Sequence, residues 1–336
     1  MAPPRGIHHV TAIAGDAQRN VDFYAGTLGM RLVKRTVNFD DPGTYHLYFG
    51  DERGTPGTIV TFFPWPGASR GREGVGQVNL VSLAIPEASL GFWLQRLVTR
   101  NVAHEDLATR FGERVIALRD PDGLRLELVA SAGASQRAGW AGGTVPEGHT
   151  IRGVHSVTIW TERFAASAAF LEGPFAMRRV GTEGNVTRYA SAGEGDALLD
   201  VRDASGFWGG SVAVGSVHHV AWRVPDDDAE LALRQTVKEF GLRPTNVLDR
   251  NYFHSVYFRE PGGTLFEIAT DVPGFAIDEP AESLGDSLVL PPWLESRRDE
   301  ISASLPPIHL PPPDPRAAAR ERMEAALLGG TAEDAR

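Results

Sequence analysis

Cysteine is absent from the 336 residues of this sequence. The absence excludes disulfide bonds, zinc sites built from thiolates and iron–sulfur clusters, and it suits a reducing compartment, so we expect a cytoplasmic protein. Any metal site must therefore be built from histidine, aspartate and glutamate. Only ten histidines are available for such a site.

Long apolar runs and an excess of positive charge are lacking as well. We find no run of 18 apolar residues and no apolar segment near the N-terminus, so we expect neither a membrane span nor a signal peptide. A formal net charge of −10 argues against nucleic acid as a partner. The composition, 42% hydrophobic and 23% charged, is that of a globular protein long enough for two ordinary domains or one large one.

Four copies of one module organise the chain. Similar segments rich in β-branched residues predict the first strand of each copy at 6–13, 77–85, 153–160 and 216–224. The pattern of an amphipathic helix follows each of them, at 20–28, 90–99, 164–171 and 228–240. Several short strand-like runs with Gly, Pro or Asp turns come next. The unit is therefore a βαβββ module of about 60–75 residues.

The modules suggest a division of the chain into three parts. We assign residues 1–140 to an N-terminal pair of modules, at about 6–66 and 76–131, and residues 141–271 to a C-terminal pair, at about 152–203 and 215–271. Residues 272–336 form a Pro-rich tail with a short helix predicted in LPPWLESRRDEI. The tail either covers a pocket as a lid or packs against a second subunit, and we expect a homo-oligomer.

Alignment of the modules indicates one complete metal site. His9 and His219, the second residues of two His-His pairs, occupy the same column of the repeat, and Glu267 lies at the centre of the apolar strand TLFEIA. A charge at that place costs several kcal/mol unless it is paired or binds a metal. Two imidazoles and a carboxylate form the facial triad of non-haem Fe(II) oxygenases. We therefore predict that these three residues bind iron, which requires modules one and four to face each other.

The other modules lack this set. Leu80 and Ser156 stand in the histidine column of modules two and three. Glu127 aligns with Glu267 but has no such partners, so we interpret it as a structural carboxylate or a relic. His46 and His104 we interpret as structural or surface residues, and we assign no role to His254.

The βαβββ repeat resembles the vicinal oxygen chelate superfamily of glyoxalases, bleomycin resistance proteins and extradiol dioxygenases. The resemblance implies an α+β fold in which the four modules pair into two curled mixed β-sheet barrels, with modules one and four forming the metal cleft. Four segments further resemble the hydroquinone-type ring-cleaving dioxygenases, such as the chlorohydroquinone 1,2-dioxygenases. These segments are residues 34–67, HHVAW, YFHSVYFREPGGTLFEIATD and LPPWLESRRDEI.

This second resemblance implies an activity and a site. The enzyme would insert both atoms of O2 into a hydroquinone-type or catechol-type aromatic diol, using Fe(II), with Mn(II) as an alternative metal. The ligands would be His9, His219 and Glu267. The pocket would be lined by His8, Thr11, His218, Arg250 and Tyr257. Among these, His218 or Tyr257 would accept the proton of the substrate, and Arg250 or His8 would stabilise developing negative charge.

Two alternatives stay open. A metal-dependent isomerase or transferase of the glyoxalase or fosfomycin-resistance kind shares the fold, but such proteins usually need only two modules for a site. A metal-free protein that binds an aromatic drug also shares it, but that interpretation leaves Glu267 unexplained. A catechol dioxygenase of the more usual extradiol type would take its first histidine from module three, where Ser156 stands.

Overall fold

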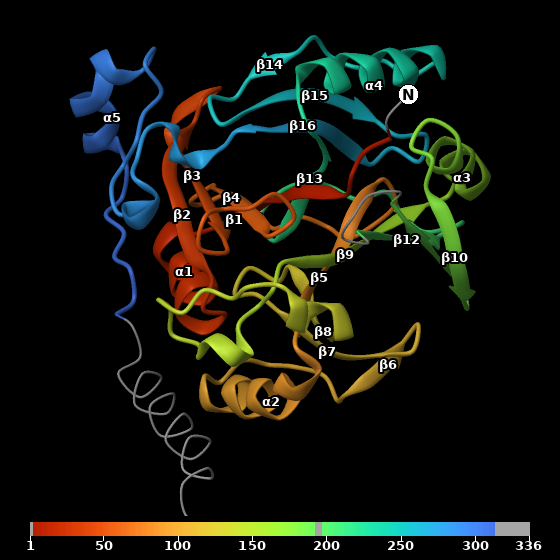
Figure 1. Ribbon diagram of the computed structural model, residues 1–336, viewed down its shortest axis with the longest axis horizontal. Coiled ribbons are helices and arrows are strands. Elements are labelled where there is room, and N and C mark those ends of the chain that lie inside the picture. The colour runs from red at the N-terminus through yellow and green to blue at the C-terminus, as the bar shows by residue number, and fades with distance from the viewer. Residues whose placement is uncertain (1–2, 192–196, 313–336) are drawn as a thin grey trace, which may run out of the picture.

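The structure is a computed structural model that describes residues 3–191 and 197–312. Residues 313–336, the end of the predicted tail, lie outside these ranges. Within them the chain forms two eight-stranded mixed sheets, which lie one above the other in Figure 1 and meet where β13 of the first contacts β5 of the second. No helix in the described ranges is long and apolar enough to cross a membrane.

The first sheet combines modules one and four, in the strand order β14-β15-β16-β13-β1-β4-β3-β2. Module one supplies β1 (Ile7–Ala14), β2 (Arg31–Asn38), β3 (Asp41–Gly50) and β4 (Ile59–Pro64). Module four supplies β13 (Ser216–Val224), β14 (Leu248–Asp249), β15 (Phe253–Arg259) and β16 (Leu265–Pro273). The modules join where β1 runs antiparallel to β13. The prediction that modules one and four face each other is therefore confirmed.

The second sheet combines modules two and three, in the order β10-β11-β12-β9-β5-β8-β7-β6. Module two supplies β5 (Gln77–Ile85), β6 (Ala108–Arg110), β7 (Glu113–Arg119) and β8 (Arg125–Ala130). Module three supplies β9 (Val154–Thr161), β10 (Arg178–Glu183), β11 (Val186–Ala190) and β12 (Leu198–Asp203). Each sheet thus unites one module from the N-terminal half of the chain with one from the C-terminal half. The proposed boundaries at residues 140 and 271 stay predictions.

Helices cover the outer faces of both sheets, and their sequences explain where they begin. They are α1 (Ala17–Val21), continued by a π-helical turn at Asp22–Thr27, and α2 (Leu90–Thr99), α3 (Phe164–Glu172) and α4 (Asp227–Glu239). Figure 1 shows α4 outside β15 and β16 and α2 at the opposite end of the molecule, outside β7 and β8. The side chains of Asp16 and Asp226 accept hydrogen bonds from backbone amides of the first turns of α1 and α4. The caps explain why these helices begin three residues and one residue before the predicted positions.

Buried carboxylates in two turns link consecutive modules across the sheets. Asp120 accepts hydrogen bonds from the backbone amides of its own turn and from the hydroxyl of Tyr24, 3.2 Å away, beside α1. In the equivalent turn, Glu260 accepts one from Ser167 of α3 at 2.7 Å. Module two is thus fastened to module one, and module four to module three, which holds the two sheets in a fixed relation.

The described part of the tail runs along the outer edge of the first sheet. Leu288 forms a parallel bridge to Arg35 of β2, and the short helix α5 (Arg298–Ser304) lies beside β3 (Figure 1). The ammonium group of Lys34, a fully buried residue, lies 2.6 Å from Asp278 and 2.5 Å from Glu279. A buried cation with two carboxylate partners is well compensated, so this contact fixes the course of the tail.

Candidate metal centre

Three adjacent strands of the first sheet bring two histidines and a glutamate together. His9 comes from β1, His219 from β13 and Glu267 from β16, and all three are buried. The Nε2 atoms of the histidines are 3.3 Å apart, and Oε2 of Glu267 lies 3.3 Å from Nε2 of His9 and 2.8 Å from Nε2 of His219. Residues that are 210 and 258 positions apart in sequence from His9 thus converge on one point.

The separations and the polarity of this group fit a metal ion. Adjacent ligands of a six-coordinate ion at about 2.1–2.2 Å lie about 3 Å apart, so the three atoms match one face of such a coordination shell. Oε2 of Glu267 is buried and accepts no hydrogen bond of good geometry within the described part of the chain. A buried carboxylate oxygen without a partner is costly, and a cation between it and the imidazoles would satisfy it.

Glu267 is held as an anion by its surroundings. Burial opposes its ionisation, but the imidazoles of His9 and His219 outweigh burial and hold the pKa of Glu267 well below its usual range. The hydroxyl of Ser255, on β15, donates a hydrogen bond to Oε1. One oxygen of the carboxylate is thus oriented by the protein, and the other faces the two imidazoles.

Each of the two histidines is oriented by the histidine before it in the sequence. Nδ1 of His8 lies 2.9 Å from Nδ1 of His9, and Nδ1 of His218 lies 2.7 Å from Nδ1 of His219. Consecutive side chains of a regular strand point to opposite faces, so such contacts require an irregularity. The pairing of β1 with β13 skips His8 on one strand and His218 on the other. Both residues are therefore the extra residues of β-bulges, a device that redirects side chains.

These bulge histidines are neutral. Burial, followed by the proximity of His9, lowers the pKa of His8 well below its usual value. Burial, followed by the proximity of His219, lowers the pKa of His218 to about 3. A histidine that binds a metal through Nε2 carries its proton on Nδ1, and each bulge histidine offers an acceptor for that proton.

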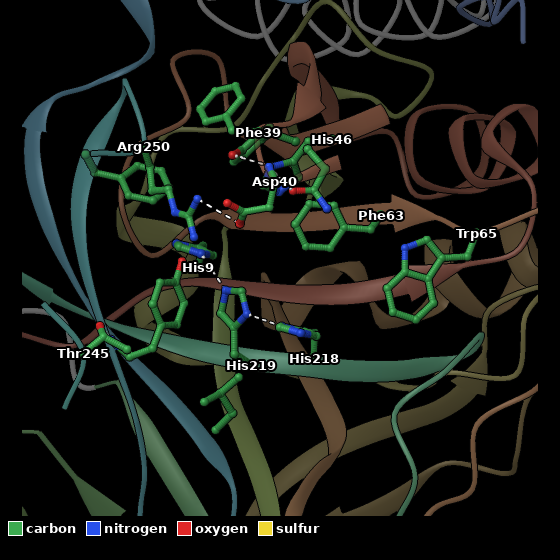
Figure 2. A pocket seen from close by; sticks show the side chains of 15 residues that line it. His9, Phe39, Asp40, His46, Phe63, Trp65, His218, His219, Thr245 and Arg250 are labelled. Carbon is green, nitrogen blue, oxygen red and sulfur yellow. Dashed lines mark hydrogen bonds and ion pairs between the residues drawn. The ribbon is translucent and has the colours of Figure 1, made fainter. Parts of the chain in front are cut away.

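A cavity of about 300 Å³ opens beside this group (Figure 2). Three of the predicted pocket residues line it: His218, Arg250 and Tyr257. The guanidinium of Arg250 lies 3.1 Å from Asp40 and 5.6 Å from the centre of the Tyr257 ring. Burial, with Glu267 nearby, raises the pKa of Tyr257, so its hydroxyl stays protonated.

The other two predicted pocket residues, His8 and Thr11, lie behind the wall of the cavity. The ring of His8 packs against Phe253, with 5.0 Å between ring centres. Thr11 is fully buried and shares a hydrogen bond of 2.9 Å with Thr61. Neither residue is among those that line the cavity. Both can act on a bound molecule only through the residues in front of them.

Several cavity residues are missing from the predicted set. His46 lines the cavity, with Nε2 2.8 Å from the hydroxyl of Thr61 and Nδ1 2.8 Å from that of Tyr48, so its interpretation as a structural or surface residue is incomplete. Alternation along β3 places His46 and Tyr48 on one face, a signal that the sequence does contain. The remaining wall is largely aromatic and comes from different modules: Phe39, Phe63, Trp65 and Phe253.

Two other histidines noted in the sequence and the second glutamate of the repeat lie elsewhere. His254 faces α4, where Nδ1 lies 2.7 Å from Asp227. His104 lies 2.9 Å from the backbone carbonyl of Val102. Glu127 accepts hydrogen bonds from Arg110 and from Ser82, so its charge is compensated by an arginine in the second sheet.

Comparison with known proteins gives several matches. The profile of the "Glyoxalase/Bleomycin resistance protein/Dioxygenase superfamily" matches residues 6–128 and 153–268. The chain is 46% identical over 305 residues to the "Putative ring-cleaving dioxygenase MhqO" of Bacillus subtilis, covering 91% of this chain and 97% of that protein. It is 37% identical over 307 residues to the "Chlorohydroquinone/hydroquinone 1,2-dioxygenase" of Sphingobium indicum, covering 88% and 94%.

Solved structures agree with the fold. A crystal structure titled as a putative dioxygenase from Bacillus subtilis superposes with a TM-score of 0.89 at 46% identity, covering 93% of this chain and all of that chain. Glyoxalase I from Zea mays superposes with a TM-score of 0.58 at 16% identity, covering 79% and 92%. The second likeness concerns the fold alone.

Proposed function

This chain belongs to the glyoxalase/bleomycin resistance protein/dioxygenase superfamily, and from that premise we propose that it is an Fe(II)-dependent dioxygenase that cleaves the ring of a hydroquinone-type diol. The convergence of His9, His219 and Glu267, with both histidines lining an aromatic cavity, carries the proposal. Relatives named as ring-cleaving and hydroquinone dioxygenases, aligned over about nine-tenths of the chain, support it.

The metal would activate the reactants, and the side chains of the cavity would orient the substrate. His9, His219 and Glu267 would hold Fe(II), which would supply Lewis acidity toward the phenolic oxygen and the redox chemistry that O2 requires. The aromatic wall, which includes Phe63 and Phe253, packs against the faces of a flat ring and excludes water. The ring would thereby be kept in one orientation, which lowers the entropic part of the activation barrier.

The polar groups of the cavity act mainly as donors. If Nε2 of His219 binds the metal, its Nδ1–H donates to Nδ1 of His218, which leaves the proton of His218 on Nε2. Tyr257 is protonated as well, because burial raises its pKa. We therefore revise the expected acceptor role of these two residues: they donate hydrogen bonds to substrate oxygens. Arg250 adds a cation that favours negative charge on the substrate.

The proton of the diol then needs another acceptor. Asp40 is the only carboxylate among the described residues that line the cavity, and its side chain is 74% exposed. It lies at the end of the β2–β3 hairpin and pairs with Arg250. We assign to Asp40 the transfer of this proton to solvent.

The decisive test compares two glutamates that occupy the same column of the repeat. Glu267→Gln should fail to retain iron after anaerobic loading and should consume no O2 with methylhydroquinone, because the anionic ligand is gone. Glu127→Gln, which removes a buried carboxylate from the second sheet, should retain both iron and activity. Iron content and O2 uptake are measured on the same samples.

Each outcome separates the alternatives. Uptake of one O2 per hydroquinone with a ring-opened product supports the proposal, and uptake with catechol alone changes the substrate but keeps the metal site. Stoichiometric metal without any O2 uptake would favour an isomerase or transferase. Full iron content and activity in Glu267→Gln would refute the assignment of the ligands.

A further inference from the structure

The second sheet repeats the first strand for strand, and this includes its bulges. The pairing of β5 with β9 skips Asn79 and His155, just as the pairing of β1 with β13 skips His8 and His218. Modules two and three therefore build a second cleft with the same backbone irregularities. At the positions where the first cleft carries its predicted metal ligands, the second cleft carries different side chains.

An arginine stands in place of a metal ion in the second cleft. On neighbouring strands, Tyr257 pairs with Glu267 in the first sheet, and Ala117 pairs with Glu127 in the second. An arginine lies seven residues before each of these partners, Arg250 before Tyr257 and Arg110 before Ala117. Because the small Ala117 replaces Tyr257, the guanidinium of Arg110 can reach Glu127, to which it donates a hydrogen bond. An internal cation thus compensates this carboxylate.

A cavity of about 330 Å³ remains beside this pair. Two apolar positions of the first cavity are arginines here. Phe63 pairs with the last part of β1, and Arg202 takes the corresponding place opposite β9. Leu265 lies two residues before Glu267, and Arg125 lies two residues before Glu127. Both arginines line the second cavity together with Arg110.

The charges in this cavity do not cancel. Arg110 is paired with Glu127, and Arg125 lies 3.5 Å from Glu73. Arg202 forms no ion pair with any residue the structure describes, and its Nε has no hydrogen-bond partner there. Glu183, an exposed residue, is the one carboxylate among the described residues that line the cavity.

The second cavity also has a flat aromatic wall and a free hydroxyl. The guanidinium of Arg202 lies 4.4 Å from the centre of the Trp160 ring. Thr158 lines the cavity, is 3% exposed, and its hydroxyl has no hydrogen-bond partner within the described ranges. A buried hydroxyl without a partner is costly, and a ligand oxygen would satisfy it.

We propose that the cleft between modules two and three binds a small, flat organic carboxylate. A guanidinium matches a carboxylate in charge and in geometry, and the Trp160 ring with the stacked Arg202 offers a surface for a conjugated or aromatic group. The inference does not depend on the proposed function, because no predicted metal ligand takes part. If ring cleavage is the reaction, its acidic product belongs to the class of ligand that fits.

Calorimetric titration of the full-length protein with benzoate tests the proposal. Benzamide serves as the uncharged probe of the same shape. Benzoate should bind at one site in the wild type and in Glu267→Gln, and benzamide should bind about tenfold more weakly or worse. Arg202→Met, which keeps the length of the side chain and removes its charge, should weaken benzoate binding by about tenfold or more. Arg178→Met, which removes an exposed arginine from β10, should bind benzoate like the wild type.

The titrations also define failure. No binding of benzoate to the wild type at about ten millimolar, equal binding of benzamide, or unchanged binding in Arg202→Met would each overturn the proposal. Loss of binding in Glu267→Gln with full binding in Arg202→Met would place benzoate in the first cavity and overturn it as well. If Arg202→Met does not fold by circular dichroism, Arg125→Met and Thr158→Val take its place with the same expected loss.

Discussion

Ser255 offers a sharp test of how the protein prepares Glu267 for a metal. Both residues are fully buried, and the Ser255 hydroxyl donates to Oε1 of the carboxylate. Ser255→Ala leaves that oxygen without its donor. A hydrogen bond to a buried charged group contributes about 1.5–3 kcal/mol, which corresponds to about 10- to 100-fold in a dissociation constant. We therefore expect Fe(II) to bind about 10- to 100-fold more weakly.

The assay is an anaerobic titration of Fe(II) against a chelator of known affinity, with the free energy of unfolding measured in parallel. Ser82→Ala is the matched control, because Ser82 is buried and donates at 3.1 Å to Glu127 in the second sheet. That variant should lose stability but keep the affinity for iron. Wild-type affinity in Ser255→Ala, or equal losses of affinity in both variants, would refute the reasoning.

Two further predictions concern charge. Burial raises the pKa of Glu230 to about 7, and both of its oxygens lack hydrogen-bond partners in the described part of the chain. Because the pKa of Glu230 is higher in the folded than in the unfolded state, the free energy of unfolding falls as the pH rises through about 7. The free energy of unfolding of Glu230→Gln, measured by denaturant titration, should therefore exceed that of the wild type by about 2–3 kcal/mol at pH 8 but not at pH 4. A difference that does not change with pH would contradict this. Arg250→Gln should lower kcat about 100-fold at unchanged iron content, since it removes the cation beside the substrate, and a loss of iron would contradict that role.

The repeat made much of the architecture predictable. Similarity among the four first strands was enough to define the modules and their helices. It also placed His9 and His219 in one column, and similarity among the last strands matched Glu267 with Glu127; the single complete set required modules one and four to face each other. The structure confirms the shared sheet. This inference was possible because a repeat supplies its own internal comparison, so that a departure such as Leu80 or Ser156 is visible without any relative.

The details of the site were less predictable for a physical reason. The contacts of His8 and His218 with their neighbours depend on two bulges, and a bulge depends on how two distant strands pair and not on the residues of either strand alone. The wall of the cavity likewise depends on tertiary structure, since Asp40 lies in a hairpin turn of module one and Arg250 near the edge strand of module four. Local sequence patterns carry no information on contacts between residues so far apart in the chain.

The pairing of the first module with the fourth has a consequence for synthesis on the ribosome. Strand β1 can pair with β4 soon after both have emerged from the ribosome. Its other edge stays unpaired until β13 has been synthesised, because Ile7 of β1 pairs with Trp222 of β13. At about 5–20 residues per second, that interval lasts roughly 10–40 s. During this time β1, an apolar strand that carries His8 and His9, has one unpaired edge. Such an edge can pair with another chain, so the nascent chain needs protection from aggregation until β13 has been synthesised.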